Sequence, residues 1–254
     1  MWQRILIGVC LWCVASAWAD ADRADLEPND VPQNGDTVAW KLSLGRYKDS
    51  INGYANDVNL RGSTGDLSFW VAQYQDASHY TQTRSGIEKQ SPLPLGRLIS
   101  SLQSASGGFV GGSVTWDLRQ NDDQWFAPMV GWGRTDGKTY YNLNFDPNDS
   151  VLVGGTFAAP HNGLVTVYRI QDDRFHTDQK VTHAAYRFNA GAQTRWTVDV
   201  FRREGRSDVD APMYSGTGVS VAWDYQRYQL KWMHDPKSNF TEANVKRLTF
   251  GLRF

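Results

Sequence analysis

The sequence has little cysteine, no long apolar run after its first segment and no tract of one charge. Only two cysteines occur in 254 residues, Cys10 and Cys13, and both lie near the start. No later apolar run reaches the roughly 18 residues of a membrane-spanning helix. Lys and Arg total 26 against 27 Asp and Glu, so nucleic acid is not expected as a partner. Beyond the first 19 residues, disulfides and cysteine chemistry are excluded.

Those first 19 residues have the layout of a cleaved secretory signal. One positive charge, Arg4, precedes an apolar run over residues 5–14, and the small-residue pattern Ala17-Trp18-Ala19 follows. The segment is too short and wrongly flanked for a transmembrane helix. We expect cleavage after Ala19. Neither cysteine follows the small residues that a lipoprotein signal requires, so a lipid anchor is not expected.

The rest of the chain divides into a leader and one domain. Residues 20–36 are acidic, contain two prolines and show no periodicity, which predicts a flexible leader. Residues 37–254 fit a single domain. They hold eight of the eleven tryptophans, an aromatic load that is unusual for a soluble β-protein.

The domain consists of short segments with a period of two, separated by turn-forming residues. In residues 37–47 one face carries Val38, Trp40, Leu42 and Leu44, and the other carries Ala39, Lys41, Ser43 and Gly45. Clean alternation recurs at residues 109–119, 194–202, 218–225 and 228–233, and looser alternation at 56–63, 67–75, 81–90, 97–105, 125–134, 151–159, 164–171 and 181–188. No helical period of comparable length appears. The pattern predicts an all-β, antiparallel fold, since successive strand residues point to opposite faces.

The last segment alternates Leu248, Phe250, Leu252 and Phe254 with polar or small residues. A strand of this kind that ends on Phe resembles the closing strand of Gram-negative outer-membrane β-barrels. The resemblance implies export across the inner membrane and a location in the outer membrane, with outer-membrane lipid and lipopolysaccharide as surroundings. It also implies that Phe250, Leu252 and Phe254 belong to a signal that the barrel-assembly machinery reads.

A barrel also satisfies the backbone. In hydrocarbon every N–H and C=O must be paired within the protein, so strands have to close into a barrel. A soluble two-sheet sandwich is the alternative, but it leaves the aromatic face and the two chain ends unexplained. Even parity, with short periplasmic turns and longer outer loops, is reached when residues 135–150 form one long outer loop. About 14 strands result, and 12 is the alternative.

The polar face of these strands predicts the lumen. Its expected lining is Lys41, Asp57, Arg61, Arg84, Glu88, Asp117, Arg119, Arg169, His183, Arg187, Arg195, Asp199, Asp224, Lys231, Arg247 and Arg253. Basic members outnumber acidic ones. Either these charges pair and fill a narrow barrel, which is usual for small barrels, or their basic excess lines a pore that favours anions.

Catalysis has weak support in the sequence. The outer-membrane barrels that the chain resembles include phospholipases and lipid A deacylases. In these enzymes the nucleophilic Ser lies two residues after a His. None of the five histidines here is followed by Ser at that spacing. His183, Ser220 and Asp224 share a predicted face and are the remaining candidates for a triad. His183 is better explained as a satisfied lumen side chain.

The segment 140–150 is the most distinctive expected outer loop. Its candidate binding residues are Tyr141, Asn142, Asn144, Asp146, Asn148 and Asp149. Oxygen ligands of this kind suit Ca²⁺, but the spacing does not match an EF-hand, and Asp-Pro and Asn-Asp are common turn formers. We therefore expect turns, with no metal and no cofactor. The neighbouring Tyr140, Tyr141 and Phe145 are equally suited to an interfacial or sugar-contacting patch.

Three functions stay open on this basis. The first is a structural or small-solute barrel that leans toward anions. The second is an outer-leaflet hydrolase acting on lipid A or phospholipid. The third is a surface module that binds envelope polysaccharide through its outer loops. The sequence leaves the oligomeric state undetermined.

Overall fold

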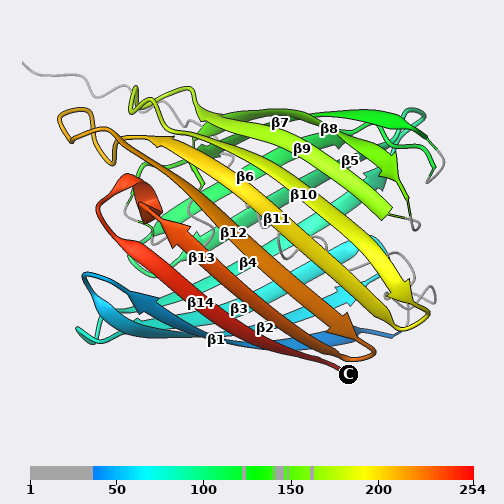
Figure 1. The fold of residues 1–254 in the computed structure, drawn as a ribbon, viewed down its shortest axis with the longest axis horizontal. Helices are drawn as coiled ribbons and strands as arrows, with labels where there is room; N and C mark the ends of the chain where they lie inside the picture. The colour runs from blue at the N-terminus through cyan, green and yellow to red at the C-terminus, as the bar shows by residue number, and fades with distance from the viewer. Residues whose placement is uncertain (1–36, 122–123, 139, 141–145, 148, 161–162) are drawn as a thin grey trace, which may run out of the picture.

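The protein forms one closed β-barrel. The computed structural model describes residues 37–254 except 122–123, 139, 141–145, 148 and 161–162. The strands are β1 (Ala39–Asp49), β2 (Gly53–Thr64), β3 (Leu67–Asp76), β4 (Thr81–Pro92), β5 (Arg97–Ala105), β6 (Phe109–Asp117), β7 (Phe126–Thr135), β8 (Ser150–Ala159), β9 (Gly163–Asp172), β10 (Lys180–Gly191), β11 (Thr194–Gly205), β12 (Tyr214–Tyr225), β13 (Tyr228–Pro236) and β14 (Asn244–Arg253) (Figure 1). A short 3₁₀ helix, η1 (Ser238–Phe240), precedes β14. No helix within these described residues is long and apolar enough to cross a membrane.

Each strand pairs antiparallel with its neighbours in the chain, and β1 pairs with β14 to close the ring. At the seam Leu44 lies opposite Phe250. The N–H groups of Trp40 and Phe254 each donate to the carbonyl of the other at 2.9 Å. Closure leaves no unpaired sheet edge. The prediction of 14 strands is confirmed, while the 12-strand count and the two-sheet sandwich are wrong.

The predicted alternation separates an apolar outer wall from a polar lumen. In β1, Lys41 and Tyr47 are buried while Leu44 is 47% exposed. The exposed large side chains on the outer wall include Val58, Val71, Ile87, Leu102, Val110, Trp116, Val130, Trp132, Val153, Val167, Val200, Leu230, Trp232, Leu248 and Phe250. Apolar residues facing outward are stable when hydrocarbon surrounds the barrel.

The two ends of the barrel differ in their connections. One end, here called the turn end, holds the C-terminus and the short turns between β2 and β3, β4 and β5, and β12 and β13 (Figure 1). In the β4–β5 turn Gly96 has φ +79°, and a Cβ there would lie 2.0 Å from the carbonyl oxygen of Asp117. Only glycine fits. The opposite loop end holds the longer connections, the longest being the predicted loop between β7 and β8.

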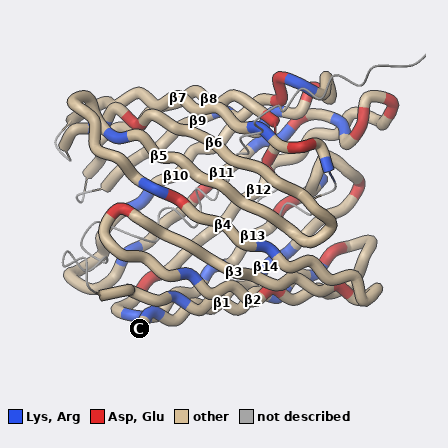
Figure 2. The backbone as a smooth tube through the Cα atoms, turned by 180° about the vertical axis from the view of Figure 1, so that it is seen from behind, with Lys and Arg blue, Asp and Glu red and all other residues tan. Residues whose placement is uncertain are grey.

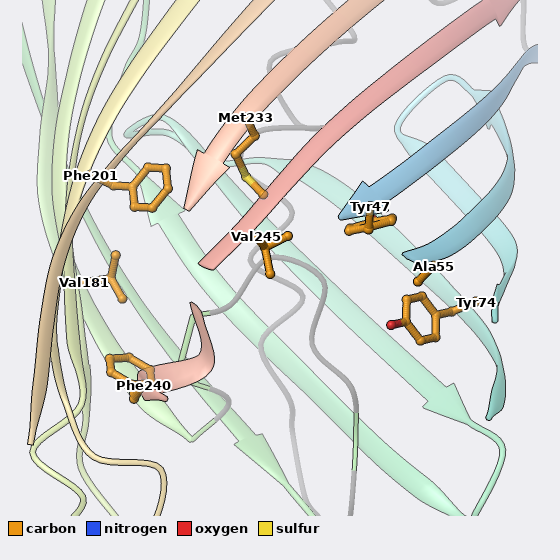
Figure 3. Close-up of a cluster of buried hydrophobic side chains, with 8 residues drawn as sticks. All are labelled: Tyr47, Ala55, Tyr74, Val181, Phe201, Met233, Phe240 and Val245. Atoms are coloured by element: carbon orange, nitrogen blue, oxygen red, sulfur yellow. The ribbon is translucent and has the colours of Figure 1, made fainter. Parts of the chain in front are cut away.

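A buried apolar cluster lies inside the barrel toward the loop end. Figure 3 shows its members, Tyr47, Ala55, Tyr74, Val181, Phe201, Met233, Phe240 and Val245. Phe240 comes from η1, which brings it to only 2% exposure. The connection between β13 and β14 therefore folds into the barrel and fills part of its interior.

Candidate functional site

The lumen carries most of the charged side chains predicted to line it. Lys41, Asp117, Arg195, Asp199, Lys231 and Arg247 are buried on the inner face. Arg61, Arg187 and Arg253 lie on the same face and are half-buried. The inner faces of β7 and β8, both fully described, hold only small, apolar or hydroxyl side chains. The charged side chains that point into the lumen therefore come from strands other than β7 and β8.

Two predicted lumen residues lie elsewhere. Arg169 is exposed, and its neighbours Tyr168 and Ile170 are buried. The prediction for Arg169 is wrong because β9 is apolar on both faces, and Tyr168 and Ile170 pack against Leu152 inside. Arg119 lies beyond the end of β6, in the connection to β7. It is therefore not part of the inner face of a strand, as the prediction required.

Ion pairs between strands hold several lumen charges. Arg84 pairs with Asp57, and Arg61 lies 3.5 Å from Glu88. A second group gathers on Asp224, whose carboxylate lies 2.5 Å from Arg253 and 3.8 Å from Arg195. Such pairs cost desolvation energy that their geometry has to offset. They fix the positions of the side chains around the lumen.

Basic charge predominates near the turn end. Within five residues of that end, the strands direct these charged residues inward: Lys41, Arg61, Arg97, Arg187, Arg195, Lys231 and Arg253 against Glu88, Asp117 and Asp224. Toward the loop end the inward positions hold Arg84, Arg203 and Arg247 against Asp49, Asp57, Asp76, Asp172, Asp199 and Asp235. Figure 2 shows basic residues near the C-terminus, and acidic residues together with basic ones at the loop end. The inward charges of the strands thus change from an acidic excess toward the loop end to a basic excess near the turn end.

The β7–β8 loop places its described residue Asp146 inside the lumen. Its Asp146 is 8% exposed, and one carboxylate oxygen lies 3.3 Å from Nε2 of His183. Nδ1 of His183 lies 2.9 Å from Asp199. The imidazole ring is stacked between Tyr168 and Phe201, with centroid distances of 4.7 and 5.4 Å. The predicted outer position of Asp146 is wrong, because its carboxylate contacts the imidazole of His183 on the inner face of β10.

Tyr140 reaches a different wall of the barrel from the same loop. Its ring stacks on Phe109 at a centroid distance of 4.3 Å, and its hydroxyl hydrogen-bonds Arg84. Burial raises the pKa of Tyr140, and the charge of Arg84 opposes this rise. The loop therefore touches β4 and β6 through Tyr140 and β10 through Asp146. Tyr140 is half-buried.

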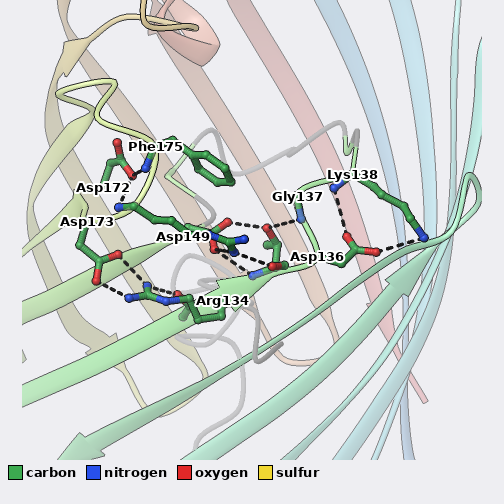
Figure 4. A network of polar contacts seen from close by, with 11 residues as sticks. Arg134, Asp136, Gly137, Lys138, Asp149, Asp172, Asp173 and Phe175 are labelled. Atoms are coloured by element: carbon green, nitrogen blue, oxygen red, sulfur yellow. Dashed lines mark hydrogen bonds and ion pairs between the residues drawn. The ribbon is translucent and has the colours of Figure 1, made fainter. Parts of the chain in front are cut away.

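A polar network fastens the base of this loop, as Figure 4 shows. Asp149 is 2% exposed and accepts a hydrogen bond from Thr135 N–H at 3.1 Å. Arg174, from the β9–β10 loop, donates to Asp149 at 2.8 Å. The predicted ligands Asp146 and Asp149 thus have separate partners, and no group of three metal-ligating side chains occurs among the described residues. Tyr141, Asn142, Asn144, Phe145 and Asn148 lie outside the described residues, as do the predicted signal and leader.

A cavity of about 400 Å³ opens among the loops at the loop end. It is bordered by Lys138 and Tyr140 of the β7–β8 loop and by Phe175, Gln179 and Asp208 of the two neighbouring loops. Phe175 is 43% exposed. The cavity therefore lies between the β7–β8, β9–β10 and β11–β12 loops.

The candidate triad does not assemble. Both ring nitrogens of His183 face carboxylates of Asp146 and Asp199, leaving neither for the hydroxyl of Ser220. Asp224 lies near the turn end and contacts Arg253. A general base has to reach the nucleophile within hydrogen-bond distance. The structure therefore gives these residues no common catalytic site.

Sequence reasoning missed one buried pair, Arg203 and Asp235. Arg203 is 1% and Asp235 0% exposed, and Arg203 Nη2 lies 3.0 Å from Asp235 Oδ2. The guanidinium also lies 5.5 Å from the ring of Phe201 and 5.4 Å from that of Phe240. Extending the alternation of β11 by one more turn of the pleat, from Phe201 to Arg203, would have placed Arg203 inside.

A closed antiparallel barrel with an apolar outer wall and a charged lumen defines this protein as an outer-membrane β-barrel. The structure is similar to the outer membrane protein Omp33 of Acinetobacter baumannii, with a TM-score of 0.52 and 10% identity over 87% of this chain and 100% of that chain. It also resembles OccAB3 of the same organism, with a TM-score of 0.47 and 8% identity over 85% of this chain and 98% of that chain. A third similar structure is OmpF of Salmonella typhi in complex with daunomycin, with a TM-score of 0.46 and 8% identity over 88% of this chain and 99% of that chain. No known family model and no curated protein matches the chain.

Proposed function

We propose that this protein is a narrow outer-membrane channel for small polar solutes that prefers anions. The observation that carries the proposal is the basic excess of the lumen near the turn end. Rings of like charge in a pore attract ions of the opposite sign. Tyr140 and Asp146 of the β7–β8 loop contact the inner wall on the loop-end side of this region.

The other two functions have less support. The hydrolase hypothesis depended on His183, Ser220 and Asp224, which do not converge. The surface-module hypothesis assigns binding to the outer loops, and in the β7–β8 loop Tyr140 stacks on Phe109 and Asp146 contacts His183. The cavity among the loops at the loop end would be suited to solute entry if it connects with the lumen.

Ion selectivity tests the proposal. In planar bilayers with a KCl gradient, we expect a reversal potential of the sign that indicates anion preference. Replacing Arg187→Gln and Lys231→Gln removes two inward basic residues and should lower the anion-to-cation permeability ratio about twofold or more. The control Arg202→Gln removes an exposed outer-wall charge that pairs with Glu204, and should leave the ratio unchanged.

Two results contradict the proposal. An assembled barrel that passes no current would show that the interior is occluded and that the role is structural. A cation-selective current would show that the basic excess near the turns does not control permeation.

Release of the β7–β8 loop should widen the pathway. Tyr140→Ala together with Asp146→Ala removes the loop's contacts with Arg84, Phe109 and His183. Because a loop inside a barrel occupies channel cross-section, single-channel conductance should rise by about twofold. Asp136→Asn is the control, since the Asp136 side chain contacts Lys138 at the loop base. Unchanged conductance in the double variant would mean that this loop does not narrow the pathway.

A further inference from the structure

Basic residues crowd the outer wall at the loop end of β1, β13 and β14. In the register Lys48 lies directly opposite Lys246, and Lys246 lies directly opposite His234. Arg46 is the outward-facing residue of β1 that precedes Lys48, one position nearer the turn end. Arg46, Lys48 and Lys246 are exposed. Here Arg46, Lys48, His234 and Lys246 are called the outer-wall basic patch.

The patch has no compensating acid among the described residues. Like charges directly opposite each other in an antiparallel pair are destabilising. No ion pair joins Lys48 or Lys246 to a carboxylate of the described chain. On β10 and β11 the situation differs, because Glu204 lies 3.0 Å from Lys180 and 2.8 Å from Arg202. Glu204 thus compensates the outer-wall residues Lys180 and Arg202, whereas no acid of the described residues compensates Lys48 and Lys246.

The patch lies where the apolar outer wall ends. Arg46 pairs with Leu248, and Leu248 pairs with Trp232. Leu248 is 51% and Trp232 42% exposed, so hydrocarbon contacts begin immediately below the basic groups. Tyr54 lies directly opposite Lys48 on β2, and its ring centroid lies 4.7 Å from the Arg46 guanidinium and 5.9 Å from Lys48 Nζ. Tyrosine and tryptophan concentrate at the two membrane–water interfaces.

From this arrangement we propose that the outer-wall basic patch binds the phosphate groups of a phosphorylated glycolipid of the outer leaflet, of the lipid A type. Ammonium and guanidinium groups are strong donors to phosphate oxygens. An anion placed between Lys48 and Lys246 turns their repulsion into attraction to a shared partner. The acyl chains of the same lipid would lie against Leu248 and Trp232, which a free phosphate ion cannot use. The proposal depends on the membrane location and not on conduction.

Thermal unfolding of the detergent-purified full chain tests the proposal, because the Lys246→Gln change should shift the unfolding temperature in opposite directions without and with lipid A. Without added lipid, Lys246→Gln should unfold at a higher temperature than the wild type, because a like-charge contact is removed. With bisphosphorylated lipid A, the order should reverse, because the variant loses a ligand for phosphate. The proposal would be overturned if dephosphorylated lipid A stabilised the wild type equally. It would also be overturned if the order of the two unfolding temperatures did not reverse when bisphosphorylated lipid A is added.

Affinity for bisphosphorylated lipid A, measured by native mass spectrometry, gives a second readout. Lys48→Gln with Lys246→Gln should weaken binding about 10-fold or more. The matched control, Lys180→Gln with Arg202→Gln, removes the same charge from the neutralised group and should change binding less than about twofold. Inorganic phosphate at the same concentration should not compete. Equal loss in both double variants, or full competition by inorganic phosphate, would show that no lipid-specific site exists here.

Discussion

Deletion of Phe254 is expected to reduce the folded barrel in the outer membrane to a small fraction of the wild-type level. Phe254 exchanges two backbone hydrogen bonds with Trp40 at the seam between β1 and β14. Its ring is 66% exposed on the outer wall, where an assembly factor can contact it. Loss of the residue removes both the last backbone pair of the seam and the proposed recognition group. Heat-modifiable mobility of the barrel in membrane fractions measures the outcome.

The control must be an aromatic residue of the outer wall. Phe157→Ala is suitable, since Phe157 is 36% exposed on β8 and lies far from the seam. Phe109 is unsuitable because it is 1% exposed and stacks on Tyr140 in the lumen. Equal membrane levels of the Phe254 deletion and Phe157→Ala would contradict a special role for the terminal residue.

Replacing Arg203→Met alone should lower the free energy of unfolding by about 3–5 kcal/mol. The change leaves Asp235 with 0% exposure and without its guanidinium partner. Breaking one side of a buried ion pair costs this much because the remaining charge is neither solvated nor compensated. Urea unfolding of the barrel in lipid vesicles, followed by tryptophan fluorescence, measures the loss.

The double variant separates pairing from packing. Arg203→Met with Asp235→Leu replaces both charges by apolar groups beside Phe201 and Phe240, and should recover most of the stability. If Arg203→Met alone loses less than about 0.5 kcal/mol, the pair contributes little and Asp235 is satisfied by other groups. If the double variant is as unstable as the single one, packing of the guanidinium matters more than its charge.

The class of fold was predictable because a strand's two faces meet different environments. The clean alternation of residues 37–47 and 218–225 recorded both the strand state and the identity of the inward side chains, such as Lys41 and Asp224. The even strand number required residues 135–150 to connect two strands, and β7 does end at Thr135 and β8 does begin at Ser150. These features depend only on residues close in sequence.

Other features were not predictable because they depend on contacts across the barrel. The segment at Arg169 carries apolar residues on both faces, so only packing of Tyr168 and Ile170 with Leu152 decides which side is inside. The composition of the β7–β8 loop is equally suited to an outer turn. The inward position of Asp146 follows from its contact with His183, 37 residues later in the chain.

Local periodicity in the sequence by itself determined an antiparallel barrel, its approximate strand number and the basic excess of its interior, because hydrophobic alternation needs only the pleat of each strand. The tertiary structure alone decided which loops fill the lumen, that Arg203 and Asp235 form a buried pair, and that Lys48 lies beside Lys246. Those arrangements arise when closure brings distant strands to fixed register, and no short-range pattern encodes that register.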